Sequence, residues 1–472
     1  MLFNSWEFLI LFLPLVFALY WMAKNRVVQN WILVLSSWYF YGYWDWRFLG
    51  LLLFSSFLDY SIGRELGKTS VAWKRKLLLA LSFSGNIGVL IYFKYFGFFL
   101  DNLEIVLQKL GFAHALPNLS IILPLGISFY TFQTFSYTLD IYKNRLAPEK
   151  SLLSFLCFVS FFPQLVAGPI EKAKTMLPQF NRSRVFNYAD AVQGARLILW
   201  GLFLKVFISL KLAKPVDLVY GNLDEAGGPL LILVQFFFYA QLYCDFAGYS
   251  YIALGLGKFM GFQLSYNFKY PLLSNNLQKF WSSWHITLNQ WFRDYLVVPL
   301  MLKYRSQGAS LLIIQLNLLL IGVWHGANWT FIACFGLISI YYLIKCGDHE
   351  SRRPFKKLGG TVVSILTFQL FIAAHMVFFR SKNIGHALDY FKSILDPNNL
   401  TPLKLGSYPL ILLPLLLLVG LVLIEFFSHK RFNYPLEQIQ KIGLVRYVFY
   451  FVMFYAIVAN IDAMQPFIYF DF

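Results

Sequence analysis

Charged residues are scarce in this sequence: they make up 13% of its 472 positions, against about 25% in an ordinary soluble domain. In their place, hydrophobic residues make up 58% of the chain and aromatic residues 20%. Apolar runs long enough to cross a bilayer as helices recur along the whole length, and the period-two alternation of membrane strands is absent. The composition therefore excludes a soluble globular protein and predicts an integral membrane protein built of helices.

Motifs of several common chemistries are missing too. The four cysteines show no CxxC spacing, so the usual signal of a zinc site or a disulfide framework is lacking. No two of the seven histidines stand within four residues of each other, which removes the HxxxH pattern of membrane di-iron oxygenases. Neither a GxxxxGKS/T phosphate-binding loop nor a GxSxG elbow occurs, which argues against nucleotide hydrolysis and serine hydrolysis. We predict no metal centre and no bound cofactor.

The net charge of +17 would suit nucleic-acid binding, but its distribution favours a membrane surface. Lysines and arginines gather in the short segments 24–26, 64–76, 143–150, 352–357 and 430–446, which lie between apolar runs. Basic loops stay on the cytoplasmic side of a membrane, close to anionic lipid headgroups. We therefore expect membrane lipids and no nucleic acid as partners, and both termini outside the cytoplasm.

About 11–13 membrane segments are expected, because a helix needs about 20 apolar residues to cross the bilayer. The candidates are 6–22, 29–44, 46–62, 77–99, 119–141, 151–169, 190–211, 229–257, 309–327, 329–346, 361–379, 407–427 and 444–462. Prolines in 151–169 favour a re-entrant segment, and a charged pair in 286–302 favours a half-membrane or interfacial one. The sequence thus predicts an all-α polytopic membrane protein with a single transmembrane domain, 1–472, and an extracytoplasmic tail at 463–472.

Two histidines stand in apolar surroundings, where an ionisable group is a functional-site hypothesis. His325 lies in Ile-Gly-Val-Trp-His-Gly-Ala-Asn-Trp (321–329), and His285 lies in Phe-Trp-Ser-Ser-Trp-His-Ile-Thr-Leu (280–288). A neutral imidazole can take a proton from a hydroxyl that attacks a carbonyl. Asn328 has the chemistry to orient such a ring or to donate to an oxyanion. Residue type alone leaves two readings open, a catalytic base and a structural histidine bonded to a carbonyl.

The segment 324–331, Trp-His-Gly-Ala-Asn-Trp-Thr-Phe, resembles the motif of the membrane-bound O-acyltransferase family, and so does the segment around His285. Further segments resemble the bacterial alginate O-acetyltransferase branch of that family. They are Phe-Asn-Ser-Trp-Glu-Phe-Leu (3–9), Pro-Leu-Gly-Ile-Ser-Phe-Tyr-Thr-Phe-Gln (124–133), Phe-Phe-Pro-Gln-Leu-Val-Ala-Gly-Pro-Ile (161–170), Asp-Phe-Ala-Gly-Tyr-Ser (245–250) and the final Phe-Ile-Tyr-Phe-Asp-Phe (467–472). The resemblance covers nearly the whole chain in order.

The resemblance implies about eleven helices around a central tunnel, with His325 as the principal catalytic histidine and His285 as its companion. It implies transfer of an acyl group, usually acetyl, from a cytoplasmic thioester such as acetyl-coenzyme A to an extracytoplasmic acceptor. A separate SGNH or esterase-like partner then places the acetyl group on a polysaccharide. This setting is the cytoplasmic (inner) membrane of a bacterium.

The resemblance also gives roles to further residues, each with a plainer alternative. In the related D-alanylation system, a Phe-Ile-Tyr-Phe-type segment of a small partner is proposed to carry the acyl group on its tyrosine. Tyr469 is the matching candidate relay here, and an interfacial aromatic anchor is the alternative. Trp324 and Asn328 are expected near the substrate.

Three charged residues have two readings each. Arg293 and Asp294 either pair with each other or lie at the donor site, where Arg293 would attract the phosphates of the thioester donor. Asp245 either fixes a histidine tautomer or satisfies a nearby backbone or tyrosine group. A transporter or channel for a glycan or lipid, with the same polar groups lining a passage, is the rival to an acyltransferase. The final acceptor and the acyl chain are left open.

Overall fold

The computed structural model describes residues 1–112, 121–223, 226–347, 358–396, 408–429, 437, 443–463 and 467–468. Within these residues the chain forms helices and no strand. The contacts divide the chain into two compact units, which are Met1–Ala195 with Ala253–Ser265, and Arg196–Ile252 with Tyr266–Phe472. Two boundaries between the units fall within α10 (Tyr188–Leu202) and α12 (Gly228–Phe259), and the third follows Ser265. The prediction of an all-helical protein is confirmed.

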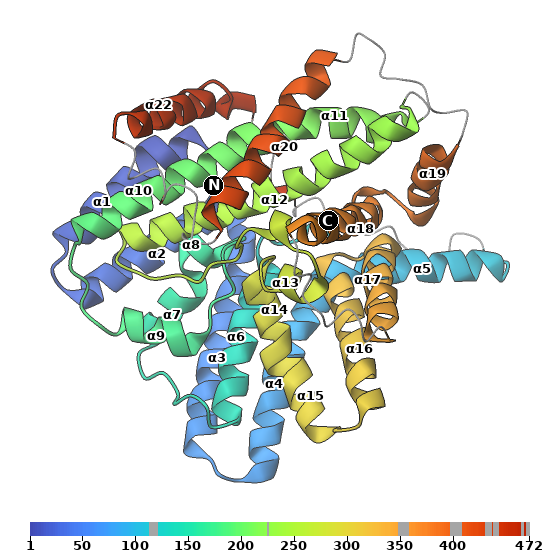
Figure 1. Cartoon of the computed structure of the whole chain (residues 1–472). Coiled ribbons are helices and arrows are strands. Elements are labelled where there is room, and N and C mark those ends of the chain that lie inside the picture. The colour runs from blue at the N-terminus through green and yellow to red at the C-terminus, as the bar shows by residue number, and fades with distance from the viewer. Residues whose placement is uncertain are drawn as a thin grey trace. The chain divides into compact units, whose positions relative to one another are not determined.

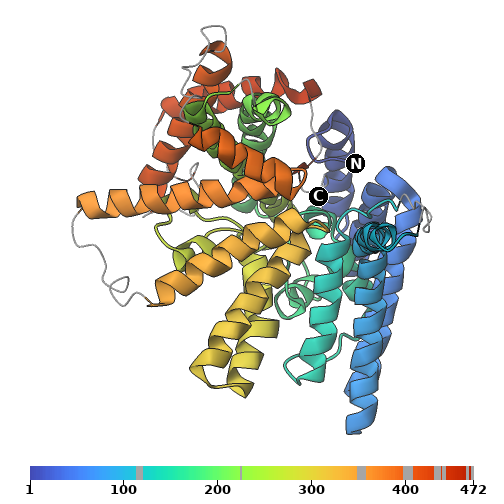
Figure 2. The same ribbon diagram turned by 90° about the vertical axis from the view of Figure 1, so that its right-hand side faces the viewer.

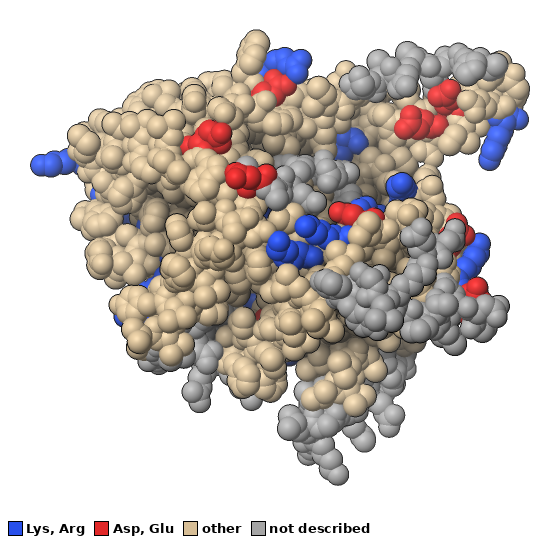
Figure 3. All heavy atoms as spheres, turned by 90° about the horizontal axis from the view of Figure 1, so that it is seen from above, with Lys and Arg blue, Asp and Glu red and all other residues tan. Residues whose placement is uncertain are grey.

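Five helices among the described residues are long and apolar enough to cross a membrane. They comprise Ala72–Lys109, Gly228–Phe259, Gln307–His325, Val362–Arg380 and Leu410–Ser428. Shorter apolar helices cover Glu7–Met22, Trp329–Ile344 and Val445–Val458. All eight coincide with predicted segments. On the face shown in Figure 3, uncharged residues dominate and charged side chains form small groups, as expected of a chain whose surface meets lipid. The protein is a multi-pass membrane protein.

The first unit is built of helices (Figure 1). Its elements are η1 (Glu7–Phe12), α1 (Leu13–Met22), α2 (Arg26–Asp45), η2 (Trp46–Phe48), α3 (Leu49–Lys68), α4 (Ala72–Leu90), η3 (Ile91–Tyr95), α5 (Phe96–Lys109), α6 (Ile127–Tyr142), α7 (Leu152–Ser160), α8 (Phe162–Leu165), α9 (Ala173–Phe180), the first part of α10 (Tyr188–Leu202) and the last part of α12 (Gly228–Phe259). The predicted re-entrant segment 151–169 is broken between α7 and α8, at Phe161.

A buried carboxylate joins three neighbouring helices of this unit. Asp59 of α3 is 0% exposed. Its Oδ1 accepts hydrogen bonds from Ser82 Oγ of α4 at 2.5 Å and Thr138 Oγ1 of α6 at 2.8 Å, and its Oδ2 accepts one from Asn86 Nδ2 of α4 at 2.7 Å. Since a buried polar group without a partner costs free energy, this network holds α3, α4 and α6 in one arrangement (Figure 1).

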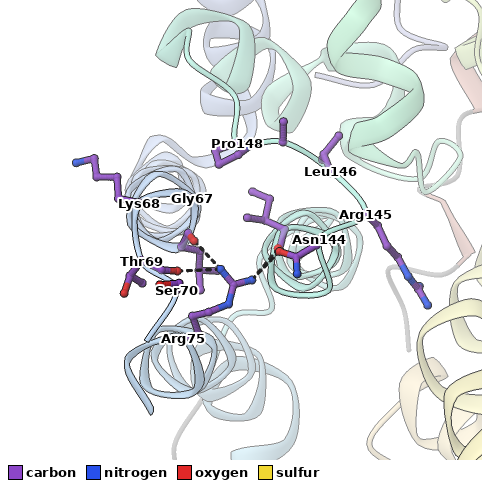
Figure 4. A pocket seen from close by; sticks show the side chains of 12 residues that line it. Gly67, Lys68, Thr69, Ser70, Arg75, Asn144, Arg145, Leu146 and Pro148 are labelled. Carbon is purple, nitrogen blue, oxygen red and sulfur yellow. Dashed lines mark hydrogen bonds between the residues drawn. The ribbon is translucent and has the colours of Figure 1, made fainter. Parts of the chain in front are cut away.

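A single guanidinium joins the ends of the same helices. Arg75, in the first turn of α4, lines a cavity of about 650 Å³ at the ends of α3 and α6 (Figure 4). It donates to Leu66 O at 2.7 Å, Thr69 O at 3.2 Å, Ile141 O at 3.2 Å, Tyr142 O at 2.7 Å and Asn144 Oδ1 at 3.1 Å. The last carbonyls of a helix have no partner within the helix, and Arg75 supplies one to both α3 and α6.

The second unit contains the rest of α10 and most of α12 (Gly228–Phe259). Its other elements are η4 (Phe203–Ser209), α11 (Leu210–Gly221), η6 (Pro271–Leu273), α13 (Leu277–Trp281), α14 (Ile286–Phe292), η7 (Arg293–Val297), α15 (Val298–Lys303), α16 (Gln307–His325), α17 (Trp329–Gly347), α18 (Leu358–Arg380), α19 (Ile384–Leu395), α20 (Tyr408–Ser428), α22 (Val445–Val458) and η11 (Ile461–Ala463). In Figure 2 the gold-to-orange α16, α17 and α18 lie next to one another in chain order.

We predict that Arg75→Met destabilises the protein by about 2 kcal/mol or more, because hydrogen bonds to a charged group contribute about 1.5–3 kcal/mol each and several carbonyls lose their donor. Lys76→Met is the matched control, since Lys76 is exposed on the same helix turn, and its effect should stay within about 0.5 kcal/mol. Thermal unfolding of the purified protein in detergent measures both. Equal effects of the two substitutions would contradict the bridging role of Arg75.

Candidate functional site

The turn that carries His285 is held in place by one asparagine, through both its main chain and its side chain. Asn267 O accepts from Ile286 N at 2.9 Å, and Asn267 Oδ1 accepts from Thr287 Oγ1 at 2.7 Å. Its amide donates to Ser250 Oγ of α12 at 3.4 Å. The start of α14 is thereby tied to α12, which fixes the residue that immediately precedes α14.

That residue is His285, and its backbone is in the left-handed region, with φ 42° and ψ 53°. Such a conformation is uncommon for a residue other than glycine and marks a place where the surrounding structure overrides local preference. His285 lies outside the spanning helices and is 1% exposed. Burial disfavours the charged imidazolium and lowers the pKa of His285 to about 3. The ring is therefore neutral at physiological pH.

His325 is the last residue of α16, and the chain turns sharply after it. Gly326 is extended, and α17 begins three residues later, at Trp329. Asn328 caps α17, because its Oδ1 accepts from Thr330 N at 3.0 Å and its amide donates to Lys382 O at 3.2 Å. These bonds give Asn328 a structural task at the turn. Its predicted contact with substrate remains a prediction.

The two histidines are linked through one tryptophan. The ring centroid of Trp324 lies 5.6 Å from that of His285 and 5.1 Å from that of His325, edge to face in both cases. His325 also stacks on Phe335 at 5.1 Å and meets the edge of Phe379 at 5.4 Å. The structure thus gathers His285, Trp324 and His325 in one aromatic cluster, where the histidines are 1% and 5% exposed.

Asp245 is paired with a lysine. Its Oδ1 lies 2.5 Å from Lys205 Nζ, and the two side chains are 7% and 3% exposed. The pair forms where two helices meet closely, because a Cβ on Gly201 would come within 2.5 Å of Gly248 O. Small residues allow helix backbones to approach each other in this way, which brings the end of α10 and the start of η4 against α12. Of the sequence-based readings of Asp245, neither named this partner.

Residues 467 and 468, near the C-terminus, lie beside this pair. Ile468 N donates to Asp245 Oδ2 at 2.9 Å. The ring of Phe467 lies 5.4 Å from that of Phe246, and Phe246 in turn meets His285 edge to face at 4.7 Å. Tyr469, the candidate relay, lies outside the described residues. Its sequence neighbour Ile468 is bound by Asp245, and Phe467 lies two ring contacts away from His285.

Arg293 and Asp294 lie on η7, where Arg293 Nε donates to Asp294 Oδ1 at 2.7 Å. Their side chains are 59% and 26% exposed, so the two residues are not part of the buried histidine cluster. The reading in which they pair with each other agrees with this bond. Binding of donor phosphates by Arg293 stays a prediction.

Sequence reasoning missed Lys205 and the aromatic rings around the histidines. A signal for Lys205 was present, since it is the one charged residue in the apolar run Leu-Phe-Leu-Lys-Val-Phe-Ile (202–208). Phe246 lies in the segment 245–250 that carries the family resemblance, although its contact with His285 was not predicted, and Phe335 and Phe379 gave no signal, because phenylalanine is common throughout this chain. Among the described residues, no three His, Cys, Asp or Glu side chains gather closely enough to hold a metal ion.

Comparison with known proteins agrees with these motifs. The sequence pattern of the membrane-bound O-acyltransferase family matches residues 142–346. A probable alginate O-acetylase of Pseudomonas aeruginosa is 33% identical over 450 residues, which cover 93% of this chain and 83% of the relative. A peptidoglycan O-acetyltransferase of Helicobacter pylori is 33% identical over 436 residues, 85% of this chain and 81% of the relative. A teichoic acid D-alanyltransferase of Streptococcus thermophilus is 32% identical over 231 residues, which cover 44% of this chain and 53% of the relative.

We predict that Gly326→Ala destabilises the protein by about 1–3 kcal/mol, the usual effect of overpacking. A Cβ at this position would overlap the ring of Phe331, which packs on Phe379 beside His325. The second substitution Phe331→Leu should recover part of the loss. Thermal unfolding of the single and double variants measures both the loss of stability and its recovery.

The matched control is Gly336→Ala, in α17. A Cβ there has no heavy atom within 4 Å, and alanine favours a helix over glycine by about 0.5–1 kcal/mol. Its effect should therefore be neutral or stabilising. If Gly326→Ala proved equally harmless, the close packing of the turn after His325 would not hold.

Proposed function

The chain belongs to the membrane-bound O-acyltransferase family and is an acyltransferase, and from this premise we propose that it transfers acetyl groups from cytoplasmic acetyl-coenzyme A to an acceptor outside the cytoplasm. The acetyl groups serve the acetylation of a cell-surface polysaccharide. The names of two relatives, an alginate O-acetylase and a peptidoglycan O-acetyltransferase, support a polysaccharide as the final acceptor. The same names support an acetyl group, rather than a longer acyl chain, as the group that is transferred.

The observation that carries the proposal is the buried cluster of His285, Trp324 and His325. We assign His325 the role of general base. Its neutral ring takes the proton of an attacking hydroxyl, whose oxygen forms a bond to the acetyl carbonyl carbon as the carbon–sulfur bond of the thioester breaks. The proton then passes to the departing thiolate. General base catalysis of this kind contributes about 10²–10⁴-fold to a rate.

The aromatic surroundings of His325 suit this role. Phe335 stacks on its ring and Phe379 meets the ring edge to face, so that the imidazole lies in an apolar setting and is 5% exposed. His285 lies on the far side of Trp324 and acts as the companion histidine. The proposal requires a tunnel that reaches His325 from both faces of the membrane.

The hydroxyl that attacks is proposed to be that of Tyr469, which then carries the acetyl group as an ester. The binding of its neighbour Ile468 by Asp245 supports this role, because Asp245 precedes Phe246, which contacts His285. An SGNH or esterase-like partner would remove the acetyl group from the tyrosine and pass it to the polysaccharide. Because the acetyl group moves in two short transfers, the charged acetyl-coenzyme A does not have to cross the hydrocarbon core of the membrane.

The proposal places the protein in the inner membrane of a bacterium. The basic segments 24–26, 64–76 and 143–150 would lie on the cytoplasmic side, where the donor is, and the tail would lie on the opposite side. A transporter of a glycan or lipid would move its substrate without transferring label from acetyl-coenzyme A, so the experiments below separate the two functions.

We predict that His325→Ala lowers acetyl transfer from radiolabelled acetyl-coenzyme A by about 10²-fold or more, since the general base is lost. The protein should remain folded by thermal unfolding and gel filtration. His375→Ala is the control, because His375 is also buried, at 2% exposure, but lies on α18 against Phe371. It should keep most of the activity. Transfer at the normal rate by the His325 variant would refute the assignment.

We predict that Tyr469→Phe abolishes the acetylated form of the tail, seen by mass spectrometry of the intact protein, and stops acetyl flux to the polysaccharide acceptor. Only one hydroxyl is removed, so folding should not change. Tyr455→Phe, at an exposed position of α22, should leave both readouts as they are. Unchanged flux in the Tyr469 variant would rule out the relay and leave the direct route from donor to acceptor.

A further inference from the structure

The ion pair of Lys205 and Asp245 is unusual because both charges are buried. Its side chains are 3% and 7% exposed. Removing two such charges from water costs several kcal/mol for each ion, and their mutual attraction repays this only with good geometry and further hydrogen bonds. A buried ion pair is therefore weak evidence for a purely stabilising role. The residues that form further contacts with Lys205 and Asp245 therefore indicate the role of the pair.

Both members of the pair contact residues near the C-terminus, Phe467 and Ile468. The carboxylate of Asp245 uses Oδ1 for Lys205 and Oδ2 for the backbone N–H of Ile468, at 2.9 Å. The ammonium of Lys205 lies 5.5 Å from the ring centroid of Phe467, within the range of a cation–π contact. Among the described residues, 467 and 468 thus supply a hydrogen bond to Asp245 and a cation–π contact to Lys205.

An aromatic site beside the pair receives Phe467, which is 1% exposed. Its ring lies 5.4 Å from that of Phe246 and 5.3 Å from that of Tyr249. Phe246 and Tyr249 are successive positions on one face of α12, three residues apart. The helix therefore binds the tail in two ways, through a side chain at Phe467 and through the main chain at Ile468.

The same stretch of α12 also contacts His285, one of the two candidate catalytic histidines. Phe246 follows Asp245 directly, and its ring meets that of His285 at 90° and 4.7 Å. A segment bound at Asp245 is thus placed beside His285 through a rigid helix.

We propose that Lys205 and Asp245 form a dock for the chain's own C-terminal segment and act as positioning residues for the acyl relay. The dock recognises an aromatic side chain followed by a free backbone N–H, which is the chemistry of Phe467 and Ile468. Neither charged residue is assigned a bond-making or bond-breaking step. This proposal rests on the proposed function, since it explains how the tail is held where His285 and His325 are.

Docking raises the local concentration of the tail hydroxyl at the site. A hydroxyl on a free tail would visit the histidines at a frequency set by the length of its tether, whereas a bound tail attacks in an oriented, effectively unimolecular step. One charge-assisted hydrogen bond and one aromatic ring hold the tail firmly without a covalent link. The segment can therefore leave to deliver its acetyl group and return.

Two double variants of the full-length protein test the dock. Removing one charge alone would leave the other buried and unpaired, so both charges are removed together. Lys205→Met with Asp245→Leu deletes the acceptor for Ile468 N–H. Lys205→Met with Asp245→Asn is the matched control, because the asparagine Oδ1 keeps an acceptor at the same place. Thermal unfolding checks that each variant folds.

The first readout is hydrogen exchange of the Ile468 amide, resolved by fragmentation mass spectrometry of the C-terminal peptide. We predict that exchange rises about tenfold or more in the Met/Leu variant and stays close to the original rate in the Met/Asn control. A third variant, Phe467→Ala, leaves the ion pair intact and should also raise exchange at Ile468. Equal exchange in the two double variants, or no change in Phe467→Ala, would overturn the dock.

The second readout is the rate at which the tail becomes acetylated in a single turnover with acetyl-coenzyme A. This rate should fall about tenfold in the Met/Leu variant, in step with the gain in exchange, while the KM for acetyl-coenzyme A stays the same. An unchanged rate despite a released tail would overturn the positioning role. A tail that is never acetylated, even without substitutions, but keeps the predicted exchange pattern would refute the relay and support the dock as a tail-binding site.

Discussion

In a chain whose helices are apolar on most faces, a buried polar group has to find its partner inside the protein, because neither lipid nor a packed core supplies one. Asp59 satisfies this condition with three side chains from two other helices. Arg75 satisfies it by donating to the ends of α3 and α6. Lys205 and Asp245 satisfy it with each other and with the end of the chain. Each pairing fixes one arrangement of helices that apolar contacts alone would leave loosely defined.

The candidate catalytic residues lie where helices end. His325 closes α16 just before an extended glycine, and His285 precedes α14 in a left-handed conformation. A side chain in the middle of an apolar helix is surrounded by its neighbours on that helix, whereas a helix end lets the chain turn and aim a ring into the interior. Asn267 and Asn328 hold these two turns through backbone hydrogen bonds. Polar residues that support the turns are therefore as necessary to the site as the histidines.

The sequence predicted much of this molecule. The eight apolar helices coincide with predicted segments, since hydropathy and length are properties of a continuous stretch. His285 and His325 were found because a polar ring in an apolar run is conspicuous. The sequence did not predict that Trp324 links them, or that Asp245 pairs with Lys205. These contacts join residues up to 40 positions apart in the chain, and no spacing rule connects such positions.

The sequence by itself determined that the protein is helical, lies in a membrane and carries two histidines in apolar segments, because each of these follows from local composition. Only the tertiary structure decided which polar groups meet. The close approach of α10 and α12 at Gly201 and Gly248 sets Lys205 opposite Asp245, and the crossing of α12 beside α14 sets Phe246 against His285. Helix crossings depend on the shapes of two surfaces at once, and that information is not contained in either segment alone.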